Sequence, residues 1–81
     1  MELKDTIALM TSGDYKERHK AEYWFVKNKL DGLTALLEKW DAGTLGFTPT
    51  CPRSTYDVQL RAMKDYCAIL ELRAVAEGVE L

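Results

Sequence analysis

The apolar residues of this 81-residue chain recur at helical spacing in two long segments. Neighbouring positions in each segment are three or four residues apart, as on one face of an α-helix. The pattern therefore predicts two long helices, each with one buried stripe. The first stripe contains Glu22, Val26, Leu30, Leu33, Leu37 and Trp40, and the second contains Tyr56, Leu60, Met63, Cys67, Leu70 and Ala74.

Residues that favour helix ends border both stripes. Asp14 can accept hydrogen bonds from the free amides of a helix start, and Glu17, three residues later, can reach back as in a capping box. Gly43 can take the positive φ of a helix C-terminus. Two prolines exclude a helix in the segment that follows, and Ser54 with Asp57 marks the start of the next helix.

A shorter apolar pattern precedes the long helix. Leu3, Ile7 and Met10 have helical spacing and predict a lead helix that folds back onto the long one. No repeat or low-complexity segment divides the chain, so we expect a single helical domain, residues 1–81. The expected fold class is all-α, a helical hairpin with a short leading helix: lead helix about 3–10, long helix about 14–41, loop about 42–53 and last helix about 54–77.

Three consecutive aromatic residues occupy the long predicted helix. Tyr23, Trp24 and Phe25 are separated by steps of about 100°, so they cannot all face one partner helix. At least one must contact another subunit or a ligand. An oligomer seam is the favoured interpretation for Trp24 and Phe25, and a stacking platform for a nucleobase is the alternative. Because so short a chain is marginally stable alone, we expect a homo-oligomer.

Charge and cysteine content narrow the classes of function. Eleven Lys and Arg against thirteen Asp and Glu give a net charge of −2, which disfavours a nucleic-acid polymer as partner. No apolar run approaches the roughly 20 residues that cross a bilayer, and the N-terminus lacks a basic signal-peptide start, so we expect a cytosolic protein with no membrane partner. Cys51 and Cys67 form neither a zinc motif nor a redox motif, and we expect both to be reduced and structural.

One face of the long helix combines a tyrosine with cations. Tyr15, Arg18 and Glu22 lie at helical spacing, and Lys29 is within about 40° of the same face. Tyr15 and Lys29 are roughly 21 Å apart along the helix, so only antiparallel packing of two copies would bring Tyr15 of one beside Lys29 of the other. The alternative is a solvated face on which Arg18 pairs with Asp14 or Glu22.

Motifs of catalysis are missing from the sequence. It has no Gly-rich phosphate cradle, no His-Glu-x-x-His motif and no pair of carboxylates placed in a core. His19, the single histidine, has no nearby acid, cysteine or serine partner, so we expect it to be an exposed or interfacial polar residue. We therefore expect that the protein is not an enzyme and that it binds neither a metal ion nor a cofactor.

The segments DYKERHKAE, LDGLTALL and QLRAMKDYCAILELRA together resemble the small phage-encoded anti-CBASS sponges, which sequester the cyclic oligonucleotide signals of a bacterial defence system. The resemblance implies a helical homohexamer, built as a trimer of dimers, that binds cyclic di- and trinucleotides without cleaving them in the cytoplasm of the infected bacterium. The matching positions are Asp14, Tyr15, Arg18, Glu22, Gln59, Met63, Tyr66, Ile69, Leu70 and Arg73.

The same resemblance implies roles for individual residues. Tyr15 and Lys29 look like contacts to a cyclic dinucleotide at a subunit interface, and Arg73 is similar to the late arginine of a separate trinucleotide pocket. Arg18 shares the face of Tyr15, and a guanidinium group suits a phosphate. Two other classes of function stay open: a helical adaptor or inhibitor that binds a host protein through its aromatic seam, and a small virion or assembly component.

Overall fold

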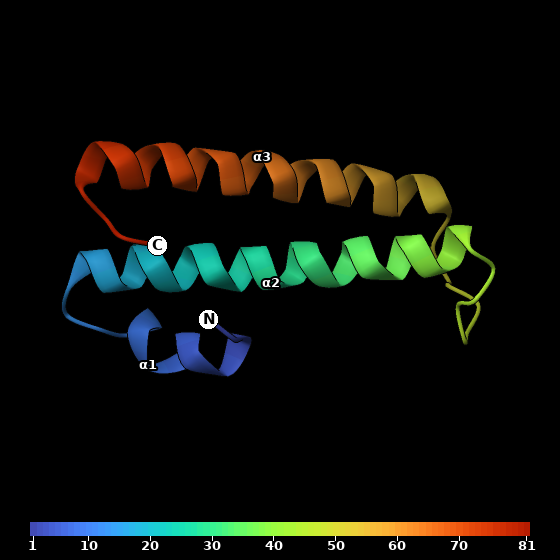
Figure 1. Ribbon diagram of the computed structural model, residues 1–81, viewed down its shortest axis with the longest axis horizontal. Coiled ribbons are helices and arrows are strands. Elements are labelled where there is room, and N and C mark those ends of the chain that lie inside the picture. The colour runs from blue at the N-terminus through green and yellow to red at the C-terminus, as the bar shows by residue number, and fades with distance from the viewer.

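The structure is a computed structural model of residues 1–81, and it is entirely helical, which confirms the predicted all-α class. Figure 1 shows α2 in the middle of a flat arrangement, with α3 along one side and α1 along the other. Since α2 is covered only along these two sides, it keeps two broad open faces. The elements are the 3₁₀ turn η1 (Leu3–Asp5), α1 (Thr6–Met10), α2 (Tyr15–Asp41) and α3 (Arg53–Glu77).

The start of α2 is fixed by two side chains. Asp14 Oδ1 accepts a hydrogen bond from the Lys16 amide at 3.0 Å, as expected of an N-cap. Glu17 does not reach back to Asp14, so the second half of the predicted capping box is wrong. Instead, the Ser12 hydroxyl donates to Glu17 at 3.0 Å and accepts from the Asp14 amide at 3.1 Å. Ser12 therefore satisfies the amide that the capping box assigned to Glu17.

Both long helices end at a glycine in the left-handed region. Gly43 has φ +72° and Gly78 has φ +69°. Beyond Gly78 the Val79 amide turns back and donates to the Ala74 carbonyl at 2.8 Å. A side chain at such a φ would strain the backbone, so glycine is the residue that allows each helix to end here. The predicted positive φ of Gly43 is confirmed.

The core lies between α2 and α3 and is small, with only ten of the 81 residues buried. Leu70 is its most deeply buried large side chain, at 1% exposed. Both predicted stripes face this core, but their members near the hairpin tip, such as Trp40 and Tyr56, are only half-buried. Glu22, predicted as part of the first stripe, lies outside the core because its carboxylate meets the Tyr66 hydroxyl on the surface. The central cluster consists of Tyr23, Val26, Leu30, Cys67 and Leu70. So small a core leaves a single chain with little apolar area to stabilise it.

His19 belongs to the interior, which corrects the expectation that it is exposed or interfacial. Its side chain is 5% exposed, and Nε2 lies 2.9 Å from the backbone carbonyl of Leu70. A carbonyl only accepts hydrogen bonds, so Nε2 carries a proton and donates it. The prediction was wrong because it considered side-chain partners alone, whereas the facing helix supplies a backbone acceptor.

The lead helix docks through a different face from the one its sequence indicates. Leu3, Ile7 and Met10 are exposed, whereas Thr6 is buried and its hydroxyl donates to the Leu3 carbonyl at 2.7 Å. The hydrogen bond satisfies the hydroxyl, so a threonine can be buried without a large penalty. Three apolar side chains are thereby left on the surface, where Leu3, Ile7 and Met10 line a hollow together with Phe25.

A clamp around Arg53 closes the hairpin tip. Its guanidinium donates to Asp41 at the end of α2 and to Asp57, four residues further along α3, and lies 5.3 Å from the centre of the Trp40 ring. Helix α3 begins at Arg53, one residue before the predicted start, and no side-chain cap is formed there. Arg53 joins both helices through its own side chain.

The clamp predicts acid sensitivity. The Arg53 guanidinium holds the pKa of Asp41 below its ordinary value of 3.8, so the stabilisation is complete above that value and is lost as pH falls through the folded-state pKa. We expect the Tm of the wild type to drop more on acidification below about pH 4 than the Tm of Arg53→Gln. Thermal denaturation across pH 2 to 7 measures this, with Arg61→Gln on the same helix as the charge control. Identical acid profiles for wild type and Arg53→Gln would contradict the clamp.

Candidate ligand-binding face

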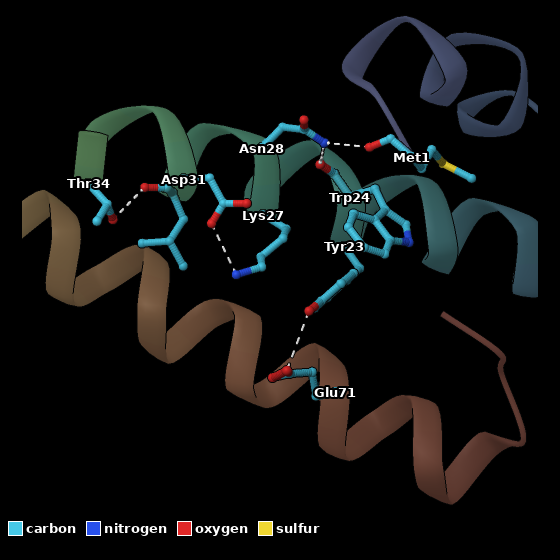
Figure 2. Close-up of polar contacts among 9 residues, drawn as sticks. Met1, Tyr23, Trp24, Lys27, Asn28, Asp31, Thr34 and Glu71 are labelled. Carbon is cyan, nitrogen blue, oxygen red and sulfur yellow. Dashed lines mark hydrogen bonds and ion pairs between the residues drawn. The ribbon is translucent and has the colours of Figure 1, made fainter. Parts of the chain in front are cut away.

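The three adjacent aromatics of α2 point in three directions. Tyr23 is buried toward α3, where its hydroxyl donates to Glu71 at 3.4 Å, as Figure 2 shows. Burial and the nearby Glu71 carboxylate raise the pKa of Tyr23. Trp24 stands edge-on to Tyr23 and donates from Nε1 to the Leu81 carbonyl at 3.1 Å. Trp24 thus has partners in its own chain, and Phe25 is the exposed member of the three. An oligomer seam at Trp24 and Phe25 stays a prediction.

Two rows of side chains, one on α2 and one on α3, occupy one broad face of the molecule. Within each row the residues are seven apart, which is nearly two helical turns, so they stand on one side of the helix about 10.5 Å from each other. The α2 row is Tyr15, Glu22 and Lys29, the α3 row is Gln59, Tyr66 and Arg73, and with Arg18, Phe25 and Met63 they form what we name the ladder face.

The two rows are joined at their centre. The Tyr66 hydroxyl donates a hydrogen bond to the Glu22 carboxylate across the groove between α2 and α3. Because the helices run antiparallel, the outer members of the rows are also level with one another, Tyr15 with Arg73 and Lys29 with Gln59. Lys29 and Gln59 indeed line the same hollow. The ladder face therefore has three rungs, with polar groups of different charge at each level.

At the central rung, the phenol of Tyr66 stays protonated. The hydrogen bond to Glu22, together with burial, raises the pKa of Tyr66, so its phenol remains a donor at neutral pH. An ionised carboxylate offers about four acceptor positions, of which Tyr66 occupies one. Glu22 therefore retains free acceptor capacity on an otherwise cationic and aromatic face.

A hollow of about 410 Å³ lies between the central rung and Lys29. The rings of Phe25 and Tyr66 form part of its wall, and its other apolar lining comes from Val26, Leu33 and Met63. The Lys29 ammonium is 5.8 Å from the centre of the Phe25 ring, a cation–π distance. The volume falls in the range of small-molecule sites, about 300–1,000 Å³.

The four residues predicted to bind ligand all lie on the ladder face, but they differ in whether their side chains already have partners within the chain. Tyr15 is 49% exposed, and the Lys29 ammonium forms no hydrogen bond or ion pair but lies 5.8 Å from the centre of the Phe25 ring. Arg18 donates to the Ser12 carbonyl at 2.6 Å, and not to Asp14 or Glu22 as the alternative interpretation expected. Arg73 pairs with Glu77 at 3.1 Å. Tyr15, Arg18 and Arg73 stand toward one end of the face, whereas Lys29 borders the hollow.

The contact between Glu22 and Tyr66 is not predicted from the sequence. The sequence places Glu22 on one face of the long helix and Tyr66 in a family motif on the other helix, with nothing that joins them. The seven-residue spacing within each row was the signal in the sequence that could have indicated it. The register of α3 against α2, which no single helix reveals, then brings the two rows together.

The two cysteines lie apart from the ladder face. Burial raises the pKa of the Cys67 thiol, which keeps it protonated and unreactive, while Cys51 is exposed in the 42–52 loop and both are free. The structure has no cluster of three or more histidine, cysteine or acidic side chains placed to hold a metal ion. None of its helices combines the length and the apolar character needed to span a bilayer.

Residues 13–76 match the family model described as Sequestin. The matched range contains α2, nearly all of α3 and every residue of the ladder face. Comparison with curated proteins and with solved structures gave no match. Because the family model covers most of the chain, this protein belongs to the Sequestin family.

Proposed function

We propose that this protein binds and sequesters cyclic oligonucleotides without cleaving them, as an anti-defence protein of a phage in the cytoplasm of the infected bacterium. The ladder face is the observation that carries the proposal, because it combines exposed rings and cations with a hollow of ligand size. The name of the Sequestin family suggests a sequestering role, and the resemblance to anti-CBASS sponges supplies the ligand class.

The ladder face suits the chemistry of a cyclic dinucleotide. Such a ligand has two flat bases and two anionic phosphates. The rings of Tyr15 and Phe25 are exposed and offer surfaces on which bases can stack. Lys29 and Arg18 offer charge-assisted hydrogen bonds to phosphate oxygens. A net charge of −2 is no obstacle, because only two ligand charges have to be matched.

Binding without chemistry is part of the proposal. Cleavage of a phosphodiester requires a nucleophile activated by a base or by a metal ion. The His19 ring is buried and hydrogen-bonded to a backbone carbonyl, and the Cys67 thiol is buried in the core. Neither side chain lies on the ladder face. A bound ligand should therefore be released chemically intact.

We further propose that the protein acts as a homo-oligomer, with a trimer of dimers as the expected form. Such a hexamer needs two different contact surfaces on each copy. One is the ladder face, bordered by the exposed Ile7 and Met10 of α1. The other is the outer surface of α3, where Ile69, Leu72 and Val75 are 54%, 71% and 85% exposed and point away from α2.

The assembly makes a direct prediction. Light scattering at micromolar concentration is expected to give a mass several times 9.2 kDa. Leu72→Lys should reduce that mass, because it places a charge in the middle of the outer apolar surface of α3. Ala35→Lys adds the same charge at an exposed position of α2 that belongs to neither contact surface and should leave the mass unchanged. A well-folded wild-type monomer would contradict the oligomer.

The function is tested by thermal shift with a panel of cyclic di- and trinucleotides. We expect a rise in Tm with some members, because a ligand that binds only the folded state stabilises it. The matching linear dinucleotides are the controls. Ligand recovered after heat denaturation should be intact by mass spectrometry. A panel without any shift would refute sequestration and favour the adaptor, and linear product that grows with protein and time would show an enzyme.

A further inference from the structure

We infer that Glu22, held in place by Tyr66, reads the base edge of the ligand and gives the ladder face a preference for guanine-containing cyclic dinucleotides. This inference rests on the proposed function, since it assigns a base to the ligand of the same site. It starts from a feature that sequestration of an anion does not explain. Glu22 is the only carboxylate in the ladder face, and it stands at the central rung.

A carboxylate in a site for a dianion must meet something other than phosphate. Two negative groups at contact distance repel each other, and more strongly when both are partly removed from water. Glu22 is half-buried, and Tyr66 holds one of its oxygens. Its remaining acceptor positions can be satisfied only by donors. In a cyclic dinucleotide these donors are the ribose hydroxyls and the N–H groups of the bases, and only the bases differ from one ligand to another.

The proposed packing of two copies puts Glu22 between two sites related by the two-fold axis. Residue 22 is midway between residues 15 and 29. An antiparallel pair that places Tyr15 of one copy beside Lys29 of the other therefore places Glu22 beside Glu22 of the second copy, as a two-fold interface requires. Two sites then flank the two carboxylates, and each site contains Tyr15 of one copy and Lys29 of the other. The ligand in each site can present the donor edge of a base to the Glu22 carboxylate beside it.

Hydrogen-bond geometry separates the bases. Guanine presents N1–H and the N2 amino group side by side, and these two donors match the two oxygens of a carboxylate. Adenine presents one amino group next to N1, an acceptor whose lone pair faces the carboxylate unfavourably. Uracil has a single N–H between two carbonyl oxygens. A site built around a fixed acceptor pair discriminates strongly against a base that leaves it unpaired.

Tyr66 acts as a positioning residue. Its hydroxyl reaches Glu22 from α3 and restricts the rotation of a side chain that would otherwise move freely on α2. The ring of Tyr66 also lines the hollow. Tyr66→Phe keeps the ring and removes only the hydroxyl, so it separates the positioning role from the packing role.

Calorimetric titration with cyclic di-GMP and cyclic di-AMP tests the inference. Wild type is expected to bind cyclic di-GMP roughly tenfold or more tightly than cyclic di-AMP, the discrimination that one bidentate pair provides. Glu22→Gln should abolish or reverse this ratio, because an amide pairs its donor and acceptor with adenine. Glu17→Gln is the matched control. It removes the same charge from α2 at an exposed position outside the ladder face, and should keep the wild-type ratio.

The outcomes distinguish this inference from the proposed function. If wild type binds both ligands equally or prefers cyclic di-AMP, or if Glu22→Gln keeps the wild-type ratio, base reading by Glu22 is overturned and sequestration stands. If wild type binds no cyclic nucleotide, both are overturned. Should Glu22→Gln fail to fold by circular dichroism, Tyr66→Phe decides. A reduced preference for cyclic di-GMP supports the inference, and an unchanged preference overturns it.

Discussion

Replacing Leu70 with alanine is expected to lower the free energy of unfolding by about 2–5 kcal/mol, enough to unfold a marginal domain. Leu70 is 1% exposed and belongs to the central cluster between α2 and α3. The substitution leaves a cavity that this small core has few neighbours to fill. Because self-association raises apparent stability, urea denaturation followed by circular dichroism should be run at one fixed protein concentration.

Val58→Ala provides the matched control on the same helix. Val58 is 65% exposed, so its truncation is expected to change the free energy of unfolding by no more than about 0.5 kcal/mol. If Leu70→Ala and Val58→Ala destabilised the protein equally, α3 would have to pack against α2 through a face other than the one in the structure.

The buried side of each long helix could be predicted from the sequence because it depends on local periodicity. Leu30 and Leu37 of α2 and Leu70 and Ala74 of α3 are buried as the stripes predict. A stripe that repeats over many turns can face a partner helix in only one way. The all-α fold class followed from the same pattern.

Short and long-range features could not be predicted in this way. A helix of five residues such as α1 has too few turns for its apolar spacing to determine how it docks, and it buries Thr6 in place of Ile7. The partner of His19 is a carbonyl 51 residues away along the chain. No local pattern shows such a partner, because it depends on the register of two helices.

In the candidate site, too, the features within one helix could be predicted, and the features that depend on two helices could not. Helical spacing placed Tyr15, Arg18 and Lys29 on one face of α2. That Arg73 lies on the same broad face, level with Tyr15, follows from the register of α3 against α2, which the contact between Tyr66 and Glu22 indicates. The roles of these four residues in binding stay predictions.

Tyr15→Ala and Lys29→Ala are each expected to weaken binding of a cyclic dinucleotide by about 1–3 kcal/mol, roughly 5- to 150-fold, through loss of base stacking or of a charge-assisted contact. Tyr15→Phe keeps the ring and should bind like wild type. Lys39→Ala removes an exposed cation near the far end of α2 and should also leave the affinity unchanged. Arg73→Ala should spare dinucleotides and impair trinucleotides. Calorimetric titration measures all five variants.

Mixing the two alanine variants tests whether one site draws on two copies. In a two-fold pair made of one Tyr15→Ala and one Lys29→Ala copy, one site loses both groups, whereas the other combines an intact Tyr15 with an intact Lys29. Unfolding and refolding the variants together should therefore restore wild-type affinity in about a quarter of the sites, given random pairing. Each variant refolded alone should restore none. Titration of the mixture with a high-affinity ligand counts the restored sites, and a mixture that binds no better than its parts would contradict a site shared between subunits.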